Sequence, residues 1–535
     1  MSNENGRGCA SQVPKFVFSD DLKEQEEQLS VDPLLQRFAA SREKFASDHY
    51  RPLYHFVSPE NSLNDPNGLC FWQGRWHLFH QGYPAEGRVH WGHAVSDDLI
   101  HWRDLPYAIY PDVEMHCFSG ATLVEDDRVI AMYHGTEAGN MVAVSSDPLL
   151  LNWEKLTGKA VIPVASPDGT PLPYSVFDPC IWKKDGMYYS LSGGAMPHKP
   201  SDRKLRVDYL FRSPDLINWE YLHPFAEEDV FGLAGDDGAC PYFWPLGDKY
   251  IMLHFSHMSS GKYMIGDYDT ERDKFVICNG GRFNFGSWTA GGVHAPSATP
   301  DGKGGVVAIF NINTGYPTEG WDQIMSLPRT LTLAGKDELS QEPAGDIESL
   351  RYDHRHIDSL TIPANKEIVL DGIAGNAMEI DVEIDINNAP FVELNVLRSP
   401  GKEEYTKIAF AKQRGFQNWE KFIGWGASWY DSCDSLITID SSYSSELPDA
   451  LSRIETAPVF LNPDEHLKLR IFIDKSVVEV FVNGKQCVAL RAYPGREDSV
   501  GVSLRSQGRD AQLVSLDAWQ MMGIYQFSWS TPFAF

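Results

Sequence analysis

A chain of 535 residues can form two or more domains with sizeable cores, and 42% hydrophobic and 22% charged residues are typical of a soluble globular protein. Its formal net charge of −28 argues against a nucleic-acid partner, because phosphate binding needs clustered lysine and arginine. It contains no run of 18 apolar residues, so we expect no membrane partner either.

Residues 1–49 are predicted to be a partly helical N-terminal extension. Asp32 before Pro33 is a favourable pair for a helix start, and apolar residues recur at helical spacing after it. The extension is expected to pack on the main domain or on a second subunit, which leaves a homodimer open. No secretory signal is visible in residues 1–15, and the eight cysteines are scattered, so we expect a cytoplasmic protein with free thiols.

Residues 50–340 change to short strands separated by turns, and they carry an internal repeat. The sequence Ser-Asp-Asp-Leu-Ile-His-Trp at 96–102 is echoed at 146–153 and 213–219, and a degenerate copy follows at 266–269. Units of several short strands that recur at such a period indicate propeller blades. Five units of this size fit the segment, which predicts a five-bladed β-propeller.

A polar linker at 341–361 separates this region from a second all-β domain at 362–535. The segments 467–473 and 476–482 are rich in apolar and β-branched residues, and Asn483-Gly484 is a strong hairpin turn. Long strands of this kind predict a β-sandwich. The fold class is therefore all-β.

Four aspartates stand at comparable points of different units. Asp65 opens the first unit, Asp178 the third, and Asp236 and Asp237 the fourth. The inner strands of a propeller face one central funnel, so residues far apart in sequence could meet there as paired carboxylates. Taken singly, each could also be an ordinary turn residue. Histidines between 77 and 101 form no metal-ligand pattern, and no phosphate-binding glycine motif is present, so we expect no metal and no cofactor.

An ordered set of motifs carries a family resemblance. The set is Asn-Asp-Pro-Asn-Gly at 64–68, Gln81, Trp-Gly-His-Ala-Val-Ser at 91–96, Phe-Ser-Gly at 118–120, Asp178-Pro179, Cys240-Pro241, Met-Ser-Leu-Pro-Arg at 325–329, Leu350-Arg351, and the segment 469–481. Over about residues 50–530 the chain resembles glycoside hydrolase family 32, the invertase, inulinase and levanase group. The resemblance implies a five-bladed propeller followed by a sandwich. It also implies retaining cleavage of terminal β-D-fructofuranosyl residues from sucrose or fructans, without a cofactor.

Matched residue by residue, the resemblance makes Asp65 the nucleophile and Asp178 the carboxylate that binds fructose hydroxyls and stabilises the transition state. It places further residues around the fructose: Asn64, Gln81, Trp91, Phe118 and Ser119.

Two positions depart from the family pattern. Phe177 stands where the family usually has arginine, and Ala239 stands where it has the glutamate acid/base. Alanine cannot transfer a proton. Either position 239 was engineered, or the acid is Asp237, with Asp236 next, or the chain binds fructosides without cleaving them. Residues two apart on a strand share a face, which favours Asp237, although a bulge at Gly238 would change which aspartate points inward.

Two further functions stay open at this point. The chain could be a fructosyltransferase or a difructose-anhydride-forming enzyme of the same family, or a catalytically disabled fructoside-binding protein. The expected partner in every case is a small-molecule or oligosaccharide fructoside.

Overall fold

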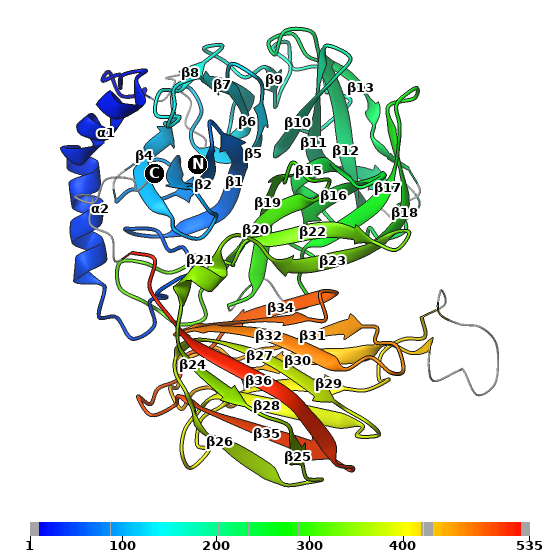
Figure 1. Ribbon diagram of the computed structural model, residues 1–535. Helices are drawn as coiled ribbons and strands as arrows, with labels where there is room; N and C mark the ends of the chain where they lie inside the picture. The colour runs from blue at the N-terminus through cyan, green and yellow to red at the C-terminus, as the bar shows by residue number, and fades with distance from the viewer. Residues whose placement is uncertain are drawn as a thin grey trace.

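The structure is a computed structural model that describes residues 10–525 apart from 86, 199, 201–202, 228, 234, 287–288, 290, 419–420 and 422–431. Figure 1 shows a ring of small sheets above a two-layered stack of longer strands, with helices along one side of the ring. The predicted fold class, a β-propeller followed by a β-sandwich with a helical N-terminal extension, is confirmed.

The N-terminal extension contains α1 (Leu22–Ser30) and α2 (Pro33–Lys44). Asp32 caps α2 as predicted, because its carboxylate accepts hydrogen bonds from the backbone N–H groups of Leu34 and Leu35. The buried Phe38 belongs to an apolar cluster with Val95 and Leu105 on strands of blade one and with Leu149 and Leu151 in a loop of blade two. Arg42 forms an ion pair with Asp104 on the outer strand of blade one. The helices are therefore fixed to the propeller rim.

Each blade is a small, mainly antiparallel sheet whose longer strands follow in sequence order from the centre outward, and in blade four the short strand at 226–227 adds to the outer edge in parallel. Blade one has β1 (Leu63–Trp72), β2 (Arg75–Gly82), β3 (His90–Ser96) and β4 (Arg103–Ile109). Blade two has β5 (Cys117–Val124), β6 (Val129–Gly135), β7 (Gly139–Ser145), β8 (Glu154–Lys155) and β9 (Ile162–Pro163). Blade three has β10 (Pro179–Lys184), β11 (Met187–His198), β12 (Arg203–Ser213) and β13 (Glu220–Pro224).

Blade four has β14 (Ala226–Glu227), β15 (Ala239–Leu246), β16 (Lys249–Phe255), β17 (Lys262–Asp269) and β18 (Lys274–Arg282). Blade five has β19 (Val293–Pro300), β20 (Val306–Ile312), β21 (Ile324–Met325), β22 (Arg329–Ala334) and β23 (Glu338–Pro343). The inner strands close a ring: β1 contacts β5 and β19, and β10 and β15 complete the circle between them. Side chains at the starts of these strands can therefore meet at the centre.

The repeated Ser-Asp motif forms the turn before the outer strand of a blade. Asp98 accepts hydrogen bonds from the backbone N–H groups of Ile100 and His101. Asp215 does the same for Ile217 and Asn218. The repeat is thus a recurring capped turn, which explains its period without any catalytic role.

The second part of the chain forms two packed antiparallel sheets. After the 3-10 turn η1 (Ile347–Leu350), one sheet contains β24 (Arg351–Ile357), β25 (Leu360–Ile362), β27 (Ala377–Asp385), β32 (Leu467–Asp474), β33 (Val477–Val482), β34 (Gln486–Arg491) and β36 (Ala511–Met521). The other contains β26 (Glu367–Ala374), β28 (Phe391–Arg398), β29 (Thr406–Ala411), β30 (Ser435–Asp440), β31 (Ile454–Val459) and β35 (Gly501–Gln507). A continuous apolar core lies between the sheets, as expected for a sandwich.

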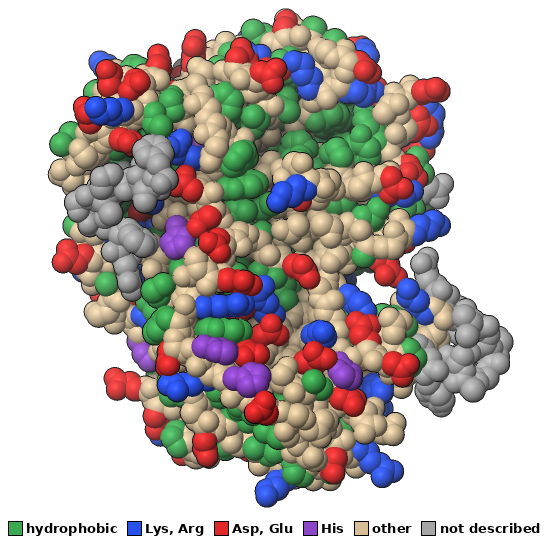
Figure 2. All heavy atoms as spheres, viewed as in Figure 1, with side chains coloured by type: hydrophobic (Ala, Val, Ile, Leu, Met, Phe, Trp, Pro, Cys, Tyr) green, Lys and Arg blue, Asp and Glu red, His purple; other side chains and the backbone are tan. Residues whose placement is uncertain are grey.

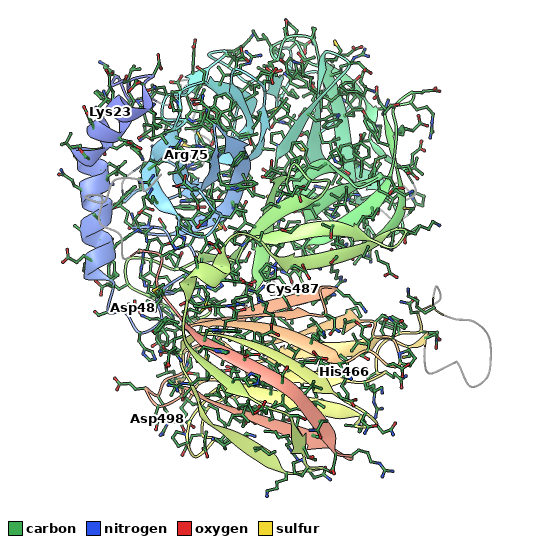
Figure 3. All side chains as sticks on the ribbon, viewed as in Figure 1. Lys23, Asp48, Arg75, His466, Cys487 and Asp498 are labelled. Atoms are coloured by element: carbon green, nitrogen blue, oxygen red, sulfur yellow. The ribbon has the colours of Figure 1, made fainter. Side chains whose placement is uncertain are left out.

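The predicted hairpin at Asn483-Gly484 joins β33 and β34, and both of its residues have positive φ. Cys487 on β34 and Asp48 mark the boundary between propeller and sandwich in Figure 3. Asp48 bridges this boundary, because its carboxylate accepts a hydrogen bond from Trp321 and its backbone carbonyl accepts one from Lys475.

A buried charged cluster also joins the two parts. His55 Nδ1 lies 2.9 Å from Asp474, and its Nε2 lies 3.2 Å from Glu479. Arg329 contacts the other oxygen of Glu479 at 3.2 Å. All four side chains are fully buried, so propeller and sandwich share one rigid junction.

Acidic side chains are spread over the face shown in Figure 2, interspersed with basic ones. Among the residues described, no helix has the length and apolar character needed to cross a membrane.

Candidate active site

The five inner strands each bring a side chain to one central cluster. These side chains are Asp65 on β1, Ser119 on β5, Asp178 directly before β10, Cys240 on β15 and His294 on β19. All of them are at most 7% exposed. The prediction that Asp65 and Asp178 converge is thus realised in the geometry, and a thiol and an imidazole lie with them.

Breaks in strand register aim these side chains inward. The pairing of β1 with β2 shifts between Leu63 and Pro66, and that of β5 with β6 shifts between Cys117 and Gly120. Similar shifts lie between Ala239 and Tyr242 and between Val293 and Pro296. A bulge re-aims a side chain that regular alternation would point elsewhere, and bulges are common beside active sites.

The turn of the first motif is fixed at Gly68. Its φ is +46°, and a Cβ there would lie 2.6 Å from Thr122. Only glycine fits both the backbone conformation and the space. The bend places Asp65 at the start of β1, before the buried apolar part of the strand begins.

Asp65 is held by hydrogen bonds as a charged carboxylate. Ser119 donates to Oδ2 at 2.6 Å and Gln81 Nε2 donates to it at 3.0 Å, while His294 Nδ1 lies 3.2 Å from Oδ1. Burial alone would raise the pKa of Asp65, but the charge of His294 and the hydrogen bonds from His294, Ser119 and Cys240 outweigh it, so this pKa lies below its ordinary value. An ionised, fixed carboxylate suits a nucleophile.

Asp178 has the opposite electrostatic environment. Burial, followed by the negative charge of Asp65, raises the pKa of Asp178 from 3.8 to about 7. The backbone N–H of Cys240 donates to its Oδ2 at 3.0 Å. Two neighbouring carboxyl groups with widely separated pKa values are a frequent arrangement in acid–base sites.

Cys240 links the two carboxylates. Its Sγ lies 3.6 Å from Oδ2 of Asp65 and 3.6 Å from Oδ2 of Asp178. Burial raises the pKa of this thiol well above its ordinary value, so it is a neutral donor. The residue has a φ of +50°, a strained conformation for a non-glycine residue that the bulge imposes.

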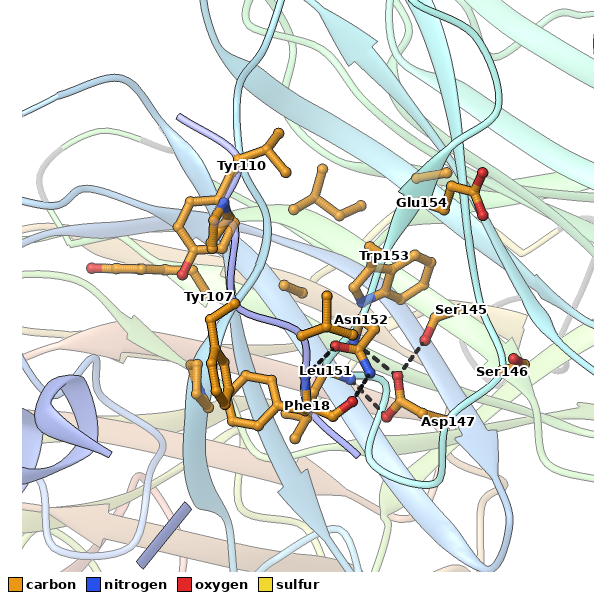
Figure 4. Close-up of a pocket in the computed structure, with 18 of the residues that line it drawn as sticks. Phe18, Tyr107, Tyr110, Ser145, Ser146, Asp147, Leu151, Asn152, Trp153 and Glu154 are labelled. Carbon is orange, nitrogen blue, oxygen red and sulfur yellow. Dashed lines mark hydrogen bonds between the residues drawn. The ribbon is translucent and has the colours of Figure 1, made fainter. Parts of the chain in front are cut away.

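A large cavity lies away from these carboxylates. About 1170 Å³ is enclosed between the N-terminal segment and the first two blades, with Tyr107, Tyr110 and Trp153 among its lining (Figure 4). Hydrogen bonds from Phe18 to Asn152 and from Asn152 to Asp147 fix one side of it (Figure 4). It contains none of the predicted site residues.

Comparison with known families accounts for both parts of the chain. The model of the "Glycosyl hydrolases family 32 N-terminal domain" matches residues 55–343, and that of the "Glycosyl hydrolases family 32 C terminal" matches residues 346–520. This chain belongs to glycoside hydrolase family 32.

Curated relatives within family 32 cover most of the chain. A levanase of Bacillus subtilis is 28% identical over 92% of this chain and 73% of its own length. A fructan 6-exohydrolase of Beta vulgaris is 27% identical over 89% of this chain and 87% of its own length.

Solved structures of family 32 share the fold. Fructan 1-exohydrolase IIa from Cichorium intybus has a TM-score of 0.76 at 24% identity, covering 89% of this chain and 98% of that one. Sucrose-6-phosphate hydrolase from Lactobacillus gasseri has a TM-score of 0.71 at 23% identity, covering 94% and 99%.

The two departures from the family 32 pattern lie in one apolar cluster. Ala239, Cys240 and Ala295 are buried together, and Phe177 packs against them. The ring of Phe177 also meets that of His134, with the ring centroids 5.6 Å apart. A change at either position therefore acts on the other.

Asp237 lies outside the strand on which its prediction was based. β15 begins at Ala239, and Gly238 has a φ of +64°, so the two-residue alternation that would align 237 with 239 does not apply. Asp237 instead holds His257: its Oδ2 lies 2.6 Å from Nδ1, and its Oδ1 accepts the backbone N–H at 3.1 Å. That Asp237 itself transfers the proton stays a prediction.

Asp236 is fully buried in a different network. Lys262 pairs with one oxygen at 2.6 Å, and Ser256 and Ser259 donate to the other. Lys262 and Ser259 hold the pKa of Asp236 below its ordinary value against the effect of burial. These contacts give Asp236 a structural explanation, and its catalytic role also stays a prediction.

The predicted fructose-subsite residues fall into two groups. Gln81 and Ser119 contact Asp65 directly, and Asn64 lies beside them, 3.4 Å from Gln81. Trp91 is fully buried, and its indole donates to the carbonyl of Phe118, so it supports the site from behind.

Sequence reasoning missed His294 and His257 and gave Cys240 no role. A usable signal was present for one of them: Pro241 follows Cys240 directly, as Pro66 follows Asp65 and Pro179 follows Asp178, whereas Pro296 stands two residues after His294. Proline at a strand start or bulge has positional meaning. No local pattern marked His257, which follows β16 in a turn.

Proposed function

We propose that this protein is a retaining β-fructofuranosidase that removes terminal β-D-fructofuranosyl residues from sucrose or fructans. One observation carries the proposal. At the centre of a family 32 propeller, the charged Asp65 and the high-pKa Asp178 are both buried, and each has an oxygen 3.6 Å from the Cys240 thiol.

In the proposed reaction, Asp65 attacks the anomeric carbon of fructose as the leaving oxygen departs, forming a fructosyl-enzyme. Ser119 and Gln81 orient its Oδ2, which leaves the carboxylate fixed before the reaction. Water then cleaves the intermediate with net retention of configuration.

Asp178 is the proposed contact for the fructose hydroxyls. Because its pKa is about 7, it carries a proton in mildly acid solution and can donate as well as accept hydrogen bonds. Hydrogen bonds to the sugar that strengthen as positive charge develops on the ring stabilise the transition state.

Relatives and neighbours support the substrate class. The names of the curated relatives include a levanase and a fructan 6-exohydrolase. The chicory enzyme was solved with 1-kestose, and a Bombyx mori β-fructofuranosidase was solved with sucrose. A terminal fructosyl unit is common to these names and ligands.

The test is incubation with sucrose, levan and inulin, with the initial anomer followed by NMR and all products separated by chromatography. We expect β-fructofuranose to appear first, and Asp65→Asn to abolish its release. An α-anomer would contradict retention. Linear or cyclic oligosaccharides in excess over fructose at high substrate concentration would identify a transferase. Sugar binding without any product from the natural sequence would identify a binding protein.

A further inference from the structure

The proposed reaction lacks a proton donor at the position where family 32 normally has one, because residue 239 is alanine. Four ionisable groups lie near this position: Asp237, His257, His294 and Asp178. His294 lies against Asp65, and Asp178 accepts a hydrogen bond from the backbone of Cys240, so both belong to the end of the site that holds the nucleophile. The remaining pair is Asp237 with His257.

His257 lies on the Ala239 side of the site. Ala239 pairs across the sheet with Phe255, and His257 follows two residues later. The ring of Phe255 meets both imidazoles edge-on, with centroids 5.4 Å from His257 and 4.3 Å from His294. The centroids of the two imidazoles are 6.0 Å apart, so His257 lies close to the histidine that contacts the nucleophile Asp65.

Solvent exposure also distinguishes the pair of His257 and Asp237 from the two central carboxyl groups. The side chains of His257 and Asp237 are 43% and 34% exposed, whereas Asp65 and Asp178 are buried. Fructose would occupy the buried end, and the leaving group would extend toward solvent. A donor to the leaving oxygen belongs at this boundary.

We infer that His257 protonates the departing oxygen and later activates water, and that Asp237 is the positioning residue that orients its ring. The inference rests on the proposed function. Asp237 holds Nδ1, so the transferable proton is on Nε2. The pair replaces a single carboxylic acid by an imidazolium held by a carboxylate, as in other sites where a third group orients the base.

The steps balance with these groups alone. In the first step the bond from Asp65 to the anomeric carbon forms, the bond to the leaving oxygen breaks, and that oxygen takes the proton of His257. In the second step neutral His257 takes a proton from water, the hydroxyl oxygen bonds to the anomeric carbon, and the Asp65 carboxylate is released. His257 is charged again at the end.

The electrostatics fit this cycle. The hydrogen bond that His257 donates to Asp237 raises the pKa of His257, and the charges of Asp237, Asp65 and Asp178 add to this effect against desolvation. The groups that face His257 are thus these three carboxyl groups and His294. Neutralising Asp65 by ester formation removes one charge and makes His257 a better acid at the moment of transfer.

A matched control exists on the outer turn of blade one. His101 Nδ1 lies 2.6 Å from Asp98, and Asp98 also accepts the backbone N–H of His101, which is the same contact set as in the His257 pair. Their side chains are 32% and 28% exposed.

The experiment compares His257→Gln with His101→Gln on two substrates. One is whichever of sucrose, levan or inulin the natural enzyme cleaves fastest, and the other is 4-nitrophenyl β-D-fructofuranoside, whose leaving group departs without protonation. His257→Gln should lower kcat on the natural substrate by about 10²–10⁴-fold and on the nitrophenyl substrate far less. Added azide should accelerate the variant on the nitrophenyl substrate and yield fructosyl azide, because azide attacks without a base. His101→Gln should match the natural enzyme.

Asp237→Asn tests positioning separately from folding. Loss of this carboxylate should move the alkaline limb of the kcat/KM profile to lower pH, because the imidazolium loses its main stabilising partner. A purely structural role would lower the rate without moving that limb, and such a result would overturn the role of Asp237.

Two results would overturn the assignment of His257: kcat of His257→Gln within a few-fold of the natural enzyme on both substrates, or the leaving-group dependence appearing in Asp178→Asn instead. Failure of the proposed function looks different, because the natural enzyme would then cleave none of these substrates.

Discussion

His294 Nδ1 lies 3.2 Å from Oδ1 of Asp65, at the centre of the ring where the first and last blades meet. Asn311 also lies against this imidazole, with its Nδ2 3.1 Å from the same nitrogen. The Asn-Asp-Pro-Asn-Gly motif and a histidine about 230 residues later in the sequence therefore act as one electrostatic unit.

Replacing His294 by glutamine should shift the acid limb of kcat/KM to higher pH by about one unit, because an opposite charge at this distance lowers a carboxyl pKa by one to three units. The loss of rate should be larger at pH 5 than at pH 7. A pH–rate profile against the natural enzyme checks this, with His101→Gln as the control. An unmoved limb would show that His294 does not set the ionisation of Asp65.

Asp178→Asn should stabilise the folded protein in alkaline solution. The folded protein keeps the Asp178 proton up to about pH 7, whereas an unfolded chain releases it near 3.8, so Asp178 destabilises the fold progressively as the pH rises from 3.8 to about 7, and the full cost remains above pH 7. The variant should gain on the order of a few kcal/mol of unfolding free energy at pH 8 and almost none at pH 4. Urea unfolding at pH 8 and pH 4 measures this gain in unfolding free energy, and an equal gain at the two pH values would contradict the raised pKa of Asp178.

Ala239→Glu alone should lower the melting temperature and give no gain in activity. It would place a carboxylate in the buried apolar cluster of Phe177, Cys240 and Ala295, and burying a charge among apolar side chains costs free energy. The double variant Phe177→Arg/Ala239→Glu should lose about 1–3 kcal/mol less unfolding free energy than the two single variants lose in sum, since residues in one cluster couple. A double-mutant cycle of thermal unfolding gives this number. A large gain in activity from Ala239→Glu alone would instead mean that position 239 had been disabled in an otherwise conventional site.

His55→Gln should destabilise the junction of propeller and sandwich by about 3–5 kcal/mol, because it leaves Asp474 and Glu479 buried without their shared cation. The hydrogen bonds of His55 to these carboxylates outweigh its burial and raise its pKa from 6.5 to about 9. Its stabilising contribution should therefore be complete below pH 6.5 and disappear as the pH rises through 9.

Chemical unfolding of the natural protein and of His55→Gln between pH 6 and 10 measures how the difference in their unfolding free energies depends on pH. His101→Gln removes the more exposed pair of His101 with Asp98, should cost under about 1 kcal/mol of unfolding free energy, and serves as the comparison. A difference between the natural protein and His55→Gln that stays constant across pH 6–10 would contradict the raised pKa of His55.

Local chemistry in the sequence predicted much of the fold. Asp32-Pro33 caps a helix and Asn483-Gly484 closes a hairpin because both signals act through neighbouring backbone atoms. The spaced Ser-Asp turns indicated blades because each caps its own turn. The two large departures, Phe177 and Ala239, were also visible in the sequence, but their contact with each other was not.

The sequence by itself determined the family, the all-β class and the pair Asp65 and Asp178, because each rests on residues close together along the chain or on an ordered set of motifs. Only the tertiary structure decided how the site is completed. Register shifts in separate blades place His294 and Cys240 against the carboxylates, and the positive φ of Gly238 takes Asp237 off the strand and onto His257. These outcomes depend on strand pairing between residues distant in sequence, which no local pattern encodes.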